Sequence, residues 1–204
     1  MKTIIISNRL PVKIIEDNNE YSFMPSEGGL ATGLGDVYKN DNSIWIGWPG
    51  MEIPEERQQE VIEKLAEFNL YPVFLTQTEI NLFYEGFSNE VLWPVFHYLV
   101  TYAHYEQSYW DAYQQVNEKF AKSASKFINQ NDKIWIQDYQ LLLLPGLLRA
   151  NQPQSTIGFF QHIPFPSYEI FRLIPWRVEL LNGLIGADLI GFHTYDDARH
   201  FIST

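Results

Sequence analysis

The sequence predicts an α/β fold, with a mainly parallel β-sheet covered by helices on both faces. Short apolar segments alternate with longer amphipathic segments along the 204 residues. Several of the short segments, such as IIIS at 4–7 and IWIG at 44–47, are apolar almost throughout instead of at every second residue. Strands of this kind are buried on both faces, which is typical of a parallel sheet between helices. The length suits one sizeable domain.

Each predicted strand is a short β-branched or aromatic run that ends near a polar residue, a proline or a glycine. The predicted strands cover residues 3–7, 43–48, 71–75, 133–137, 156–160 and 188–192. Between the first two, residues 12–24 alternate loosely around Asp17, Asn18 and Asn19. That pattern predicts a hairpin.

The predicted helices carry apolar residues at spacings of three and four. They cover residues 28–39, 55–68, 106–128, 140–150, 175–184 and 195–202. In the second of them, Val61, Leu65 and Phe68 share one face. Residues 78–97 predict short helices broken at Gly86 and Pro94, because both residue types weaken a helix interior.

Composition excludes several classes of protein. The formal net charge of −11 leaves no basic stripe for nucleic acid. With no cysteine there is no disulfide framework and no thiolate chemistry, which fits a reducing compartment. The first apolar run, three isoleucines, is too short for a signal peptide or a membrane span. We therefore expect a cytoplasmic protein without a membrane partner.

Ligands of open parallel sheets bind beyond the carboxyl ends of the strands. Polar or aromatic side chains follow five of the predicted strands at that edge. These residues are Arg9, Trp48, Asp138, His162 and His193. They are the first candidates for a binding site.

Each candidate also has a purely structural interpretation. Arg9 offers a planar fork for a phosphate group, or it forms an ion pair with a carboxylate. Asp138 accepts hydrogen bonds from sugar hydroxyls, or it caps the helix predicted near Gln140. His162 faces a ligand, or it is a core histidine bonded to a backbone carbonyl. By default, core positions are expected for the aromatic residues Trp48, Tyr84 and Trp93.

Signals for other chemistries are weak. The segment EGGLATGLG at 27–35 is neither a phosphate-binding Walker loop nor a dinucleotide fingerprint. Its Gly28 and Gly29 either let backbone N–H groups approach a phosphate or form a tight turn. No HExxH motif, Cys/His cluster or GxSxG motif is present, so we expect no metal, no cofactor and no serine nucleophile.

Six segments, taken in order, resemble the trehalose-6-phosphate synthase family of glycosyltransferases. They are SNRLP at 7–11, GGL at 28–30, YEGFSNEVLWP at 84–94, WIQDYQLLLLP at 135–145, GFFQHIPFPS at 158–167 and GADLIGFHT at 186–194. The resemblance implies the GT-B architecture, in which two Rossmann-like domains face each other across a cleft. It implies that residues 1–204 are the N-terminal, acceptor-side domain and that the donor-binding C-terminal domain lies outside them.

The resemblance also implies an activity and a set of roles. The reaction transfers glucose from UDP-glucose to glucose 6-phosphate with retention of configuration, and it gives trehalose 6-phosphate and UDP. The implied acceptor-binding residues are Arg9, Trp48, Tyr84, Trp93 and Asp138. The implied donor-binding residues are Gly28, Gly29 and His162. His162 and Asp138 are the residues that the resemblance implies for catalysis.

One segment departs from the family pattern. Where the family has HDYHL, this chain has QDYQL, with Gln137 and Gln140 in the two histidine positions. Asp138 is kept, but glutamine cannot carry charge. Two alternatives therefore stay open: a non-catalytic homologue that senses a sugar phosphate, and a GT-B glycosyltransferase with another acceptor. We expect these 204 residues alone to be inactive, and we leave a homo-oligomer open.

Overall fold

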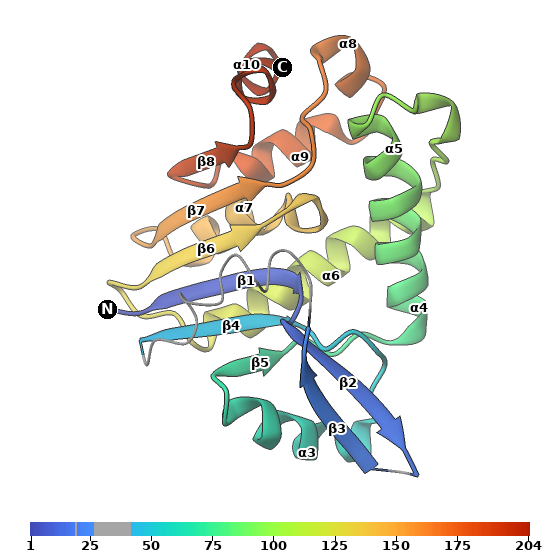
Figure 1. The fold of residues 1–204 in the computed structure, drawn as a ribbon. Coiled ribbons are helices and arrows are strands. Elements are labelled where there is room, and N and C mark those ends of the chain that lie inside the picture. Colours follow the sequence, from blue (N-terminus) through green and yellow to red (C-terminus); the bar gives the residue numbers. More distant parts are fainter. Residues whose placement is uncertain (19, 27–41) are drawn as a thin grey trace.

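The computed structural model describes residues 1–18, 20–26 and 42–204. Six parallel strands form one sheet in the order β5-β4-β1-β6-β7-β8 (Figure 1). Their bounds are Thr3–Arg9 (β1), Ser43–Trp48 (β4), Leu70–Pro72 (β5), Lys133–Gln137 (β6), Thr156–Gln161 (β7) and Leu189–Phe192 (β8). Counted along the chain within this sheet, the spatial order is 3-2-1-4-5-6, the order of the Rossmann fold. The predicted parallel α/β fold is confirmed.

The predicted hairpin is also confirmed. Strands β2 (Val12–Asp17) and β3 (Glu20–Pro25) pair antiparallel as a separate two-stranded sheet. Val12 and Ile14 turn inward and pack in the same apolar cluster as α3 (Glu55–Ala66). The hairpin is therefore anchored beside β4 and β5 and projects from the sheet near the end of β1 (Figure 1).

The remaining elements are helical. They are α4 (Gln77–Glu79), the π-helical η1 (Ile80–Leu92), α5 (Trp93–Phe96), the 3₁₀ turns η2 (Val100–Tyr102) and η3 (Tyr139–Leu141), α6 (Gln107–Ser125), α7 (Leu144–Asn151), α8 (Tyr168–Phe171), α9 (Arg177–Leu184) and α10 (Tyr195–Ser203). The helix predicted over 28–39 lies outside the described residues. In the rest of the chain, the sequence missed α8, a single turn after a proline-rich segment.

Alternating side chains of the central strand reach two separate cores. Ile4 and Ile6 of β1 face the larger core, which includes apolar residues of η1, α5, α6, α7 and α9. Ile5 faces the smaller core with Val61 and Leu65 of α3. The helix predicted over 55–68 ends earlier, at Ala66, so Phe68 does not continue the face of Val61 and Leu65 and is 58% exposed. Both faces of the central strands are buried, as the apolar runs predicted.

The prediction of short helices broken at Gly86 and Pro94 is wrong. Residues 77–96 form one uninterrupted helical run, because α4, η1 and α5 follow each other directly. Wide π-helical turns carry the chain into Pro94, and the last of them is closed by the Trp93 N–H donating to the Ser88 carbonyl. Gly86 is buried against α6, where an added Cβ would lie 2.7 Å from the Tyr109 ring. The glycine here allows two helices to approach closely.

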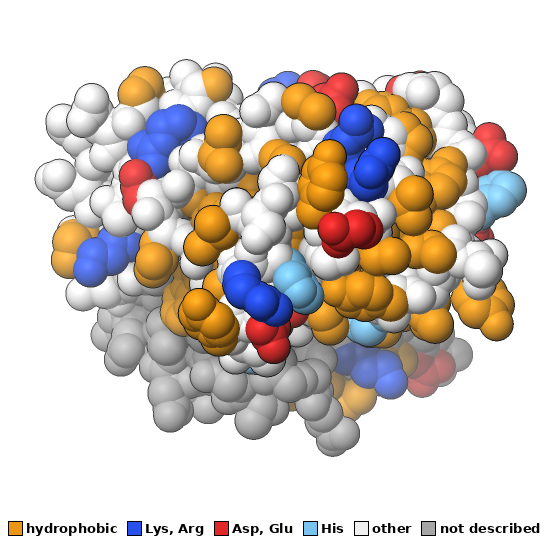
Figure 2. Space-filling model, turned by 90° about the horizontal axis from the view of Figure 1, so that it is seen from above, with side chains coloured by type: hydrophobic (Ala, Val, Ile, Leu, Met, Phe, Trp, Pro, Cys, Tyr) orange, Lys and Arg blue, Asp and Glu red, His pale blue; other side chains and the backbone are white. Residues whose placement is uncertain are grey.

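The sheet edge at β8 is less covered than the centre. No residue of β8 or α10 is fully buried. Figure 2 looks down on this side and shows apolar side chains mixed with acidic, basic and histidine side chains. Among the described residues, no helix is both long enough and apolar enough to cross a bilayer.

Candidate functional site

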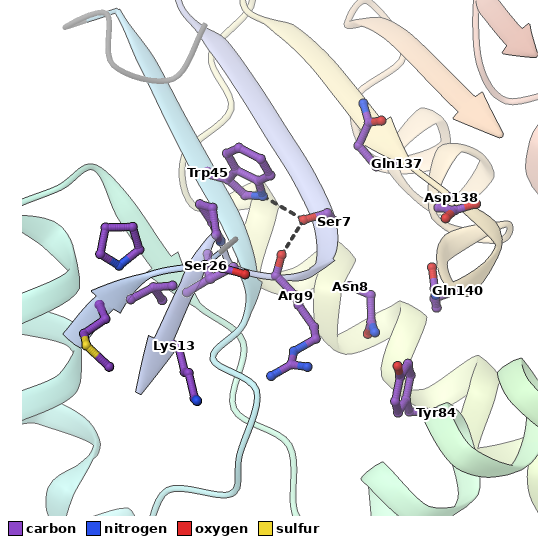
Figure 3. A pocket seen from close by; sticks show the side chains of 15 residues that line it. Ser7, Asn8, Arg9, Lys13, Ser26, Trp45, Tyr84, Gln137, Asp138 and Gln140 are labelled. Carbon is purple, nitrogen blue, oxygen red and sulfur yellow. Dashed lines mark hydrogen bonds between the residues drawn. The ribbon is translucent and has the colours of Figure 1, made fainter. Parts of the chain in front are cut away.

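The topology places a crevice between β1 and β6. From β1 the chain moves outward to β4 and β5, and it then returns to start β6 on the other side of β1. Loops that leave two such strands diverge, and ligands bind there in open α/β sheets. A cavity of about 720 Å³ lies at this point, lined by the end of β1, the hairpin, η1 and the turn after β6 (Figure 3). Its polar lining residues are Ser7, Asn8, Arg9, Lys13, Ser26, Tyr84, Gln137, Asp138 and Gln140.

A bulge at the end of β1 aims two consecutive side chains into the cavity. Ile6 pairs with Ile46 and Arg9 pairs with Trp48, so β1 holds one more residue than β4 over this interval. In a regular strand, neighbouring side chains point to opposite faces, whereas a bulge redirects them. Asn8 and Arg9 consequently both line the cavity.

The Arg9 guanidinium packs against the end of β4 and the loop that follows it. The guanidinium carbon lies 5.3 Å from the centre of the Trp48 ring, within range of a cation–π interaction. Gly50 has φ +96°, and a Cβ there would overlap the guanidinium. No carboxylate of the described residues forms an ion pair with Arg9, so the structural alternative for this arginine finds no support.

Asp138 joins the ends of two strands. Its Oδ1 accepts hydrogen bonds from the backbone N–H of Tyr139 at 3.0 Å and of His162 at 3.1 Å. It thus caps the η3 turn, as the structural interpretation predicted, and it also lines the cavity. Burial raises the pKa of the Asp138 carboxyl above its usual value, against the effect of these N–H donors and of His162.

The backbone of Asp138 is strained. Its φ of 73° and ψ of 170° fall in a region that only glycine occupies readily. Such strain costs on the order of 1–3 kcal/mol and persists only where the surroundings enforce it. Helix α6 supplies that support: Tyr113 Oη donates to the Tyr139 carbonyl at 2.8 Å, and Asn117 Nδ2 donates to the Gln140 carbonyl at 3.1 Å.

His162 sits beside this strained turn. Its Nε2 lies 2.6 Å from Gln137 Oε1, so its ring bonds to a side-chain amide and not to the backbone carbonyl of the structural alternative. The His193 ring stands edge-on, with the two ring centres 5.5 Å apart. Burial and His193 lower the pKa of His162, although Asp138 opposes this. His162 is therefore a half-buried ring at the end of β7 whose pKa lies below its usual value.

The three aromatic candidates occupy different places. Tyr84 of η1 lines the cavity. Trp48 is buried behind it, with its Nε1 donating to the Met51 carbonyl at 3.1 Å and its ring 5.8 Å from that of Tyr84. Trp93 is 43% exposed, and its ring lies 4.0 Å from that of His97 at a tilt of 34°. Neither tryptophan lines the cavity. Trp48 packs against Arg9 and Tyr84, which do line it.

The other residues predicted for the site differ in where the structure places them. Gly28 and Gly29 lie outside the described residues. Of the residues expected at the site, the structure brings Arg9, Tyr84 and Asp138 to the cavity. Sequence reasoning gave no role to Asn8 and Lys13. Asn8 follows a predicted strand directly and was a detectable candidate, whereas Lys13 lines the cavity from the start of the hairpin, whose position the sequence does not give. Within the described residues, no group of three or more acidic, histidine or cysteine side chains is placed to hold a metal ion.

The chain is similar to known glycosyltransferases along its whole length. The sequence model of glycosyltransferase family 20 matches residues 1–204. An alpha,alpha-trehalose-phosphate synthase (UDP-forming) of Candida albicans is 47% identical over 209 residues, covering 100% of this chain and 44% of the Candida protein. The chain thus spans less than half the length of this curated relative.

Solved structures are similar over the same extent. The alpha,alpha-trehalose-phosphate synthase (UDP-forming) of Burkholderia xenovorans in complex with glucose-6-phosphate superposes with a TM-score of 0.79 at 31% identity, covering 100% of this chain and 42% of that one. An Escherichia coli structure titled as trehalose-6-phosphate bound with UDP-2-fluoro glucose gives a TM-score of 0.80 at 31% identity, again covering 100% and 42%.

Proposed function

Because this chain belongs to glycosyltransferase family 20, we propose that it forms the acceptor-binding half of an enzyme that transfers glucose from UDP-glucose to glucose 6-phosphate. The products are trehalose 6-phosphate and UDP. One observation carries the proposal: Arg9, without an ion-pair partner among the described residues, faces the same cavity as Asp138.

The cavity suits a sugar phosphate. A guanidinium binds a phosphate group through two parallel hydrogen bonds, and Arg9 presents one at the cavity wall. Asp138, Tyr84 and Gln140 surround the rest of the space with groups that accept or donate hydrogen bonds to hydroxyls. The Burkholderia relative, whose structure contains glucose-6-phosphate, supports this acceptor.

The donor lies toward the β7 end of the crevice. His162 contacts the glucose of UDP-glucose, and Gly28 and Gly29 approach the diphosphate. The basic groups that hold the UDP diphosphate lie outside these 204 residues, in a second Rossmann-like domain. The Escherichia coli structure with UDP-2-fluoro glucose supports a donor of this class.

The reaction proceeds by positioning. The acceptor's anomeric hydroxyl attacks the donor's anomeric carbon on the face that UDP leaves, so configuration is retained. One C–O bond forms while the bond from that carbon to the diphosphate oxygen breaks, and the hydroxyl proton passes to the departing oxygen. Arg9 anchors the acceptor and Asp138 orients it. This fixed geometry lowers the entropy cost of bringing the two substrates together.

A transfer assay on the whole polypeptide that contains this chain tests the proposal. UDP-glucose is supplied with glucose 6-phosphate or with glucose, and the disaccharide and UDP are both quantified. Trehalose 6-phosphate and UDP in equal amounts, from the phosphorylated acceptor only, are expected. Binding of glucose 6-phosphate without turnover would instead establish a sensing homologue, and turnover with glucose alone would establish a different acceptor. A cytoplasmic location stays a prediction, and the oligomeric state stays open.

A further inference from the structure

The cavity contains a buried acceptor that no protein donor reaches. Asn8 is 6% exposed, and its Oδ1 has no hydrogen-bond partner among the described residues. An unpaired buried polar atom is rare in folded proteins, because it loses its hydrogen bonds to water on folding and gains none from the protein. This oxygen is itself shielded from solvent, but its residue lines the cavity, so a turn of the amide group would present the oxygen to a ligand.

The fold holds Asn8 in this position. The β1 bulge turns Asn8 and Arg9 into the same cavity, although they are consecutive in the chain. Figure 3 shows the Asn8 side chain between Arg9 on one side and Gln140 and Tyr84 on the other. A molecule that binds Arg9 through its phosphate group and Asp138 through its sugar therefore lies next to Asn8.

The chemistry of the atom defines the ligand group. A carboxamide oxygen accepts hydrogen bonds and donates none, so its partner carries a donor. Phosphate oxygens at neutral pH are acceptors, which leaves a hydroxyl of the sugar. We propose that Asn8 is a specificity residue, whose Oδ1 accepts a hydrogen bond from one ring hydroxyl of the acceptor sugar. This inference rests on the proposed function.

Three other buried amides are poorer candidates. Gln137 Nε2 also lacks a partner, but its side chain is held by the bond to His162. Asn117 Oδ1 and both amide atoms of Gln161 are unpaired, yet neither residue lines the cavity. Asn8 alone among these four combines an unpaired acceptor with a place beside the arginine.

Deoxy analogues of the acceptor test the inference. The value of kcat/KM is measured in the whole polypeptide for glucose 6-phosphate and for its 2-deoxy, 3-deoxy and 4-deoxy analogues. The wild type is expected to discriminate against one analogue by about tenfold or more, since that analogue leaves Oδ1 unpaired. In Asn8→Leu the same analogue should come within about twofold of glucose 6-phosphate, because the discriminating oxygen is gone.

Thermal unfolding separates a binding role from a structural one. Leucine has a similar shape and no unpaired acceptor, so ligand-free Asn8→Leu should melt at or above the wild-type temperature. Asn81→Leu, at an exposed position of η1, serves as the control and should change neither profile.

Three outcomes are decisive. Retained discrimination in Asn8→Leu would overturn the inference while the proposed function stands. A lower melting temperature with an equal loss for every acceptor would make Asn8 structural and would also overturn it. A wild type that transfers no glucose to glucose 6-phosphate would overturn the proposed function and the inference with it.

Discussion

At the scale of single residues, Asp138 shows how a structural and a functional interpretation coexist. The carboxylate caps the η3 turn and ties it to β7 through the His162 N–H, as a local structural residue would. The same side chain lines the cavity from a strained backbone. The two hydrogen bonds that satisfy the cap therefore also fix the carboxylate that we assign to the acceptor.

The Gln137–His162 pair gives a prediction about charge. In Gln137→Glu a carboxylate would replace the amide oxygen 2.6 Å from His162 Nε2, and it would favour the imidazolium. We expect the His162 pKa, held below 6.5 by burial and His193 in the wild type, to rise in this variant. Proton NMR of the ring Hε1 measures it, with Gln137→Met as the uncharged control.

The same pair sets the sign of a stability effect. Because burial depresses the folded-state pKa of His162, its contribution to stability is full above the unfolded-state value of about 6.5 and is lost as pH falls below it. Gln137→Glu should weaken this acid sensitivity. A wild-type His162 that titrates at or above 6.5, or a pKa unmoved by the new carboxylate, would refute this account of the pair.

Residue-level prediction worked where residue type and strand position coincided. Arg9 and Asp138 both end predicted strands, and both reach the cavity. Trp48 met the same rule but is buried, because the end of a strand does not specify on which side a side chain lies. Asn8 directly follows the same predicted strand as Arg9 and was a detectable candidate, but only the bulge, which the sequence does not show, turns it to the face that Arg9 uses.

At the scale of elements, one hydroxyl fastens the β1 bulge. Ser7 Oγ donates to the Arg9 carbonyl at 2.7 Å and accepts from Trp45 Nε1 at 2.7 Å. Ser7→Ala removes both bonds from a buried site, so we expect unfolding free energy to fall by about 2 kcal/mol and Tm by roughly 4–8 °C. Calorimetry measures this loss. Ser22→Ala, which deletes an exposed 3.3 Å bond, is the matched control and should change Tm little.

The bulge also couples stability to binding. Ser7→Ala should raise the KM for glucose 6-phosphate, since Arg9 follows the bulge directly, while Ser22→Ala should not. A Ser7→Ala protein as stable as the Ser22→Ala protein would show that the hydroxyl does not hold the bulge.

Gly86 makes a prediction about helix packing. Gly86→Ala would place a Cβ 2.7 Å from the Tyr109 ring, and overpacking of this kind typically costs about 1–3 kcal/mol. Gly158→Ala is the control, because its Cβ would meet its nearest neighbour at an ordinary 3.8 Å. Denaturant unfolding compares the two. Adding Tyr109→Leu should restore most of the stability lost in Gly86→Ala, and equal stability of the two alanine variants would contradict the packing argument.

The helices illustrate what local pattern can predict. Apolar spacing located α3, α6, α9 and α10 to within a few residues, because one face of each contacts the sheet or its neighbours. The 77–96 run was misjudged because glycine and proline were weighed by local propensity alone. Tertiary contact with α6 and π-helical hydrogen bonding outweigh that propensity here.

At the scale of the whole molecule, strand order determines the site. The switch between β1 and β6 brings together residues 9 and 138, which lie far apart in the sequence. Alternating apolar and amphipathic segments predicted the parallel sheet, but not which strands neighbour each other. The packing of the hairpin beside the cavity depends on long-range contacts that no local pattern encodes.

The division of labour between domains gives a whole-molecule prediction. Residues 1–204 expressed alone should form no trehalose 6-phosphate from UDP-glucose and glucose 6-phosphate, because in the proposed function the groups that neutralise the leaving diphosphate belong to a second domain. The whole polypeptide, assayed in parallel, is the control. Steady product formation by the 204 residues would contradict the proposed division.

Calorimetric titration of the whole polypeptide with glucose 6-phosphate, glucose and inorganic phosphate tests the central claim most directly, with Arg9→Ala beside the wild type. We predict that glucose 6-phosphate binds more tightly than either fragment. Arg9→Ala should weaken it by about 10- to 100-fold, the loss of a charged phosphate contact. Arg172→Ala, at an exposed arginine away from the cavity, should bind as the wild type does. Equal affinity of the wild type and Arg9→Ala, or glucose binding as tightly as glucose 6-phosphate, would contradict the account.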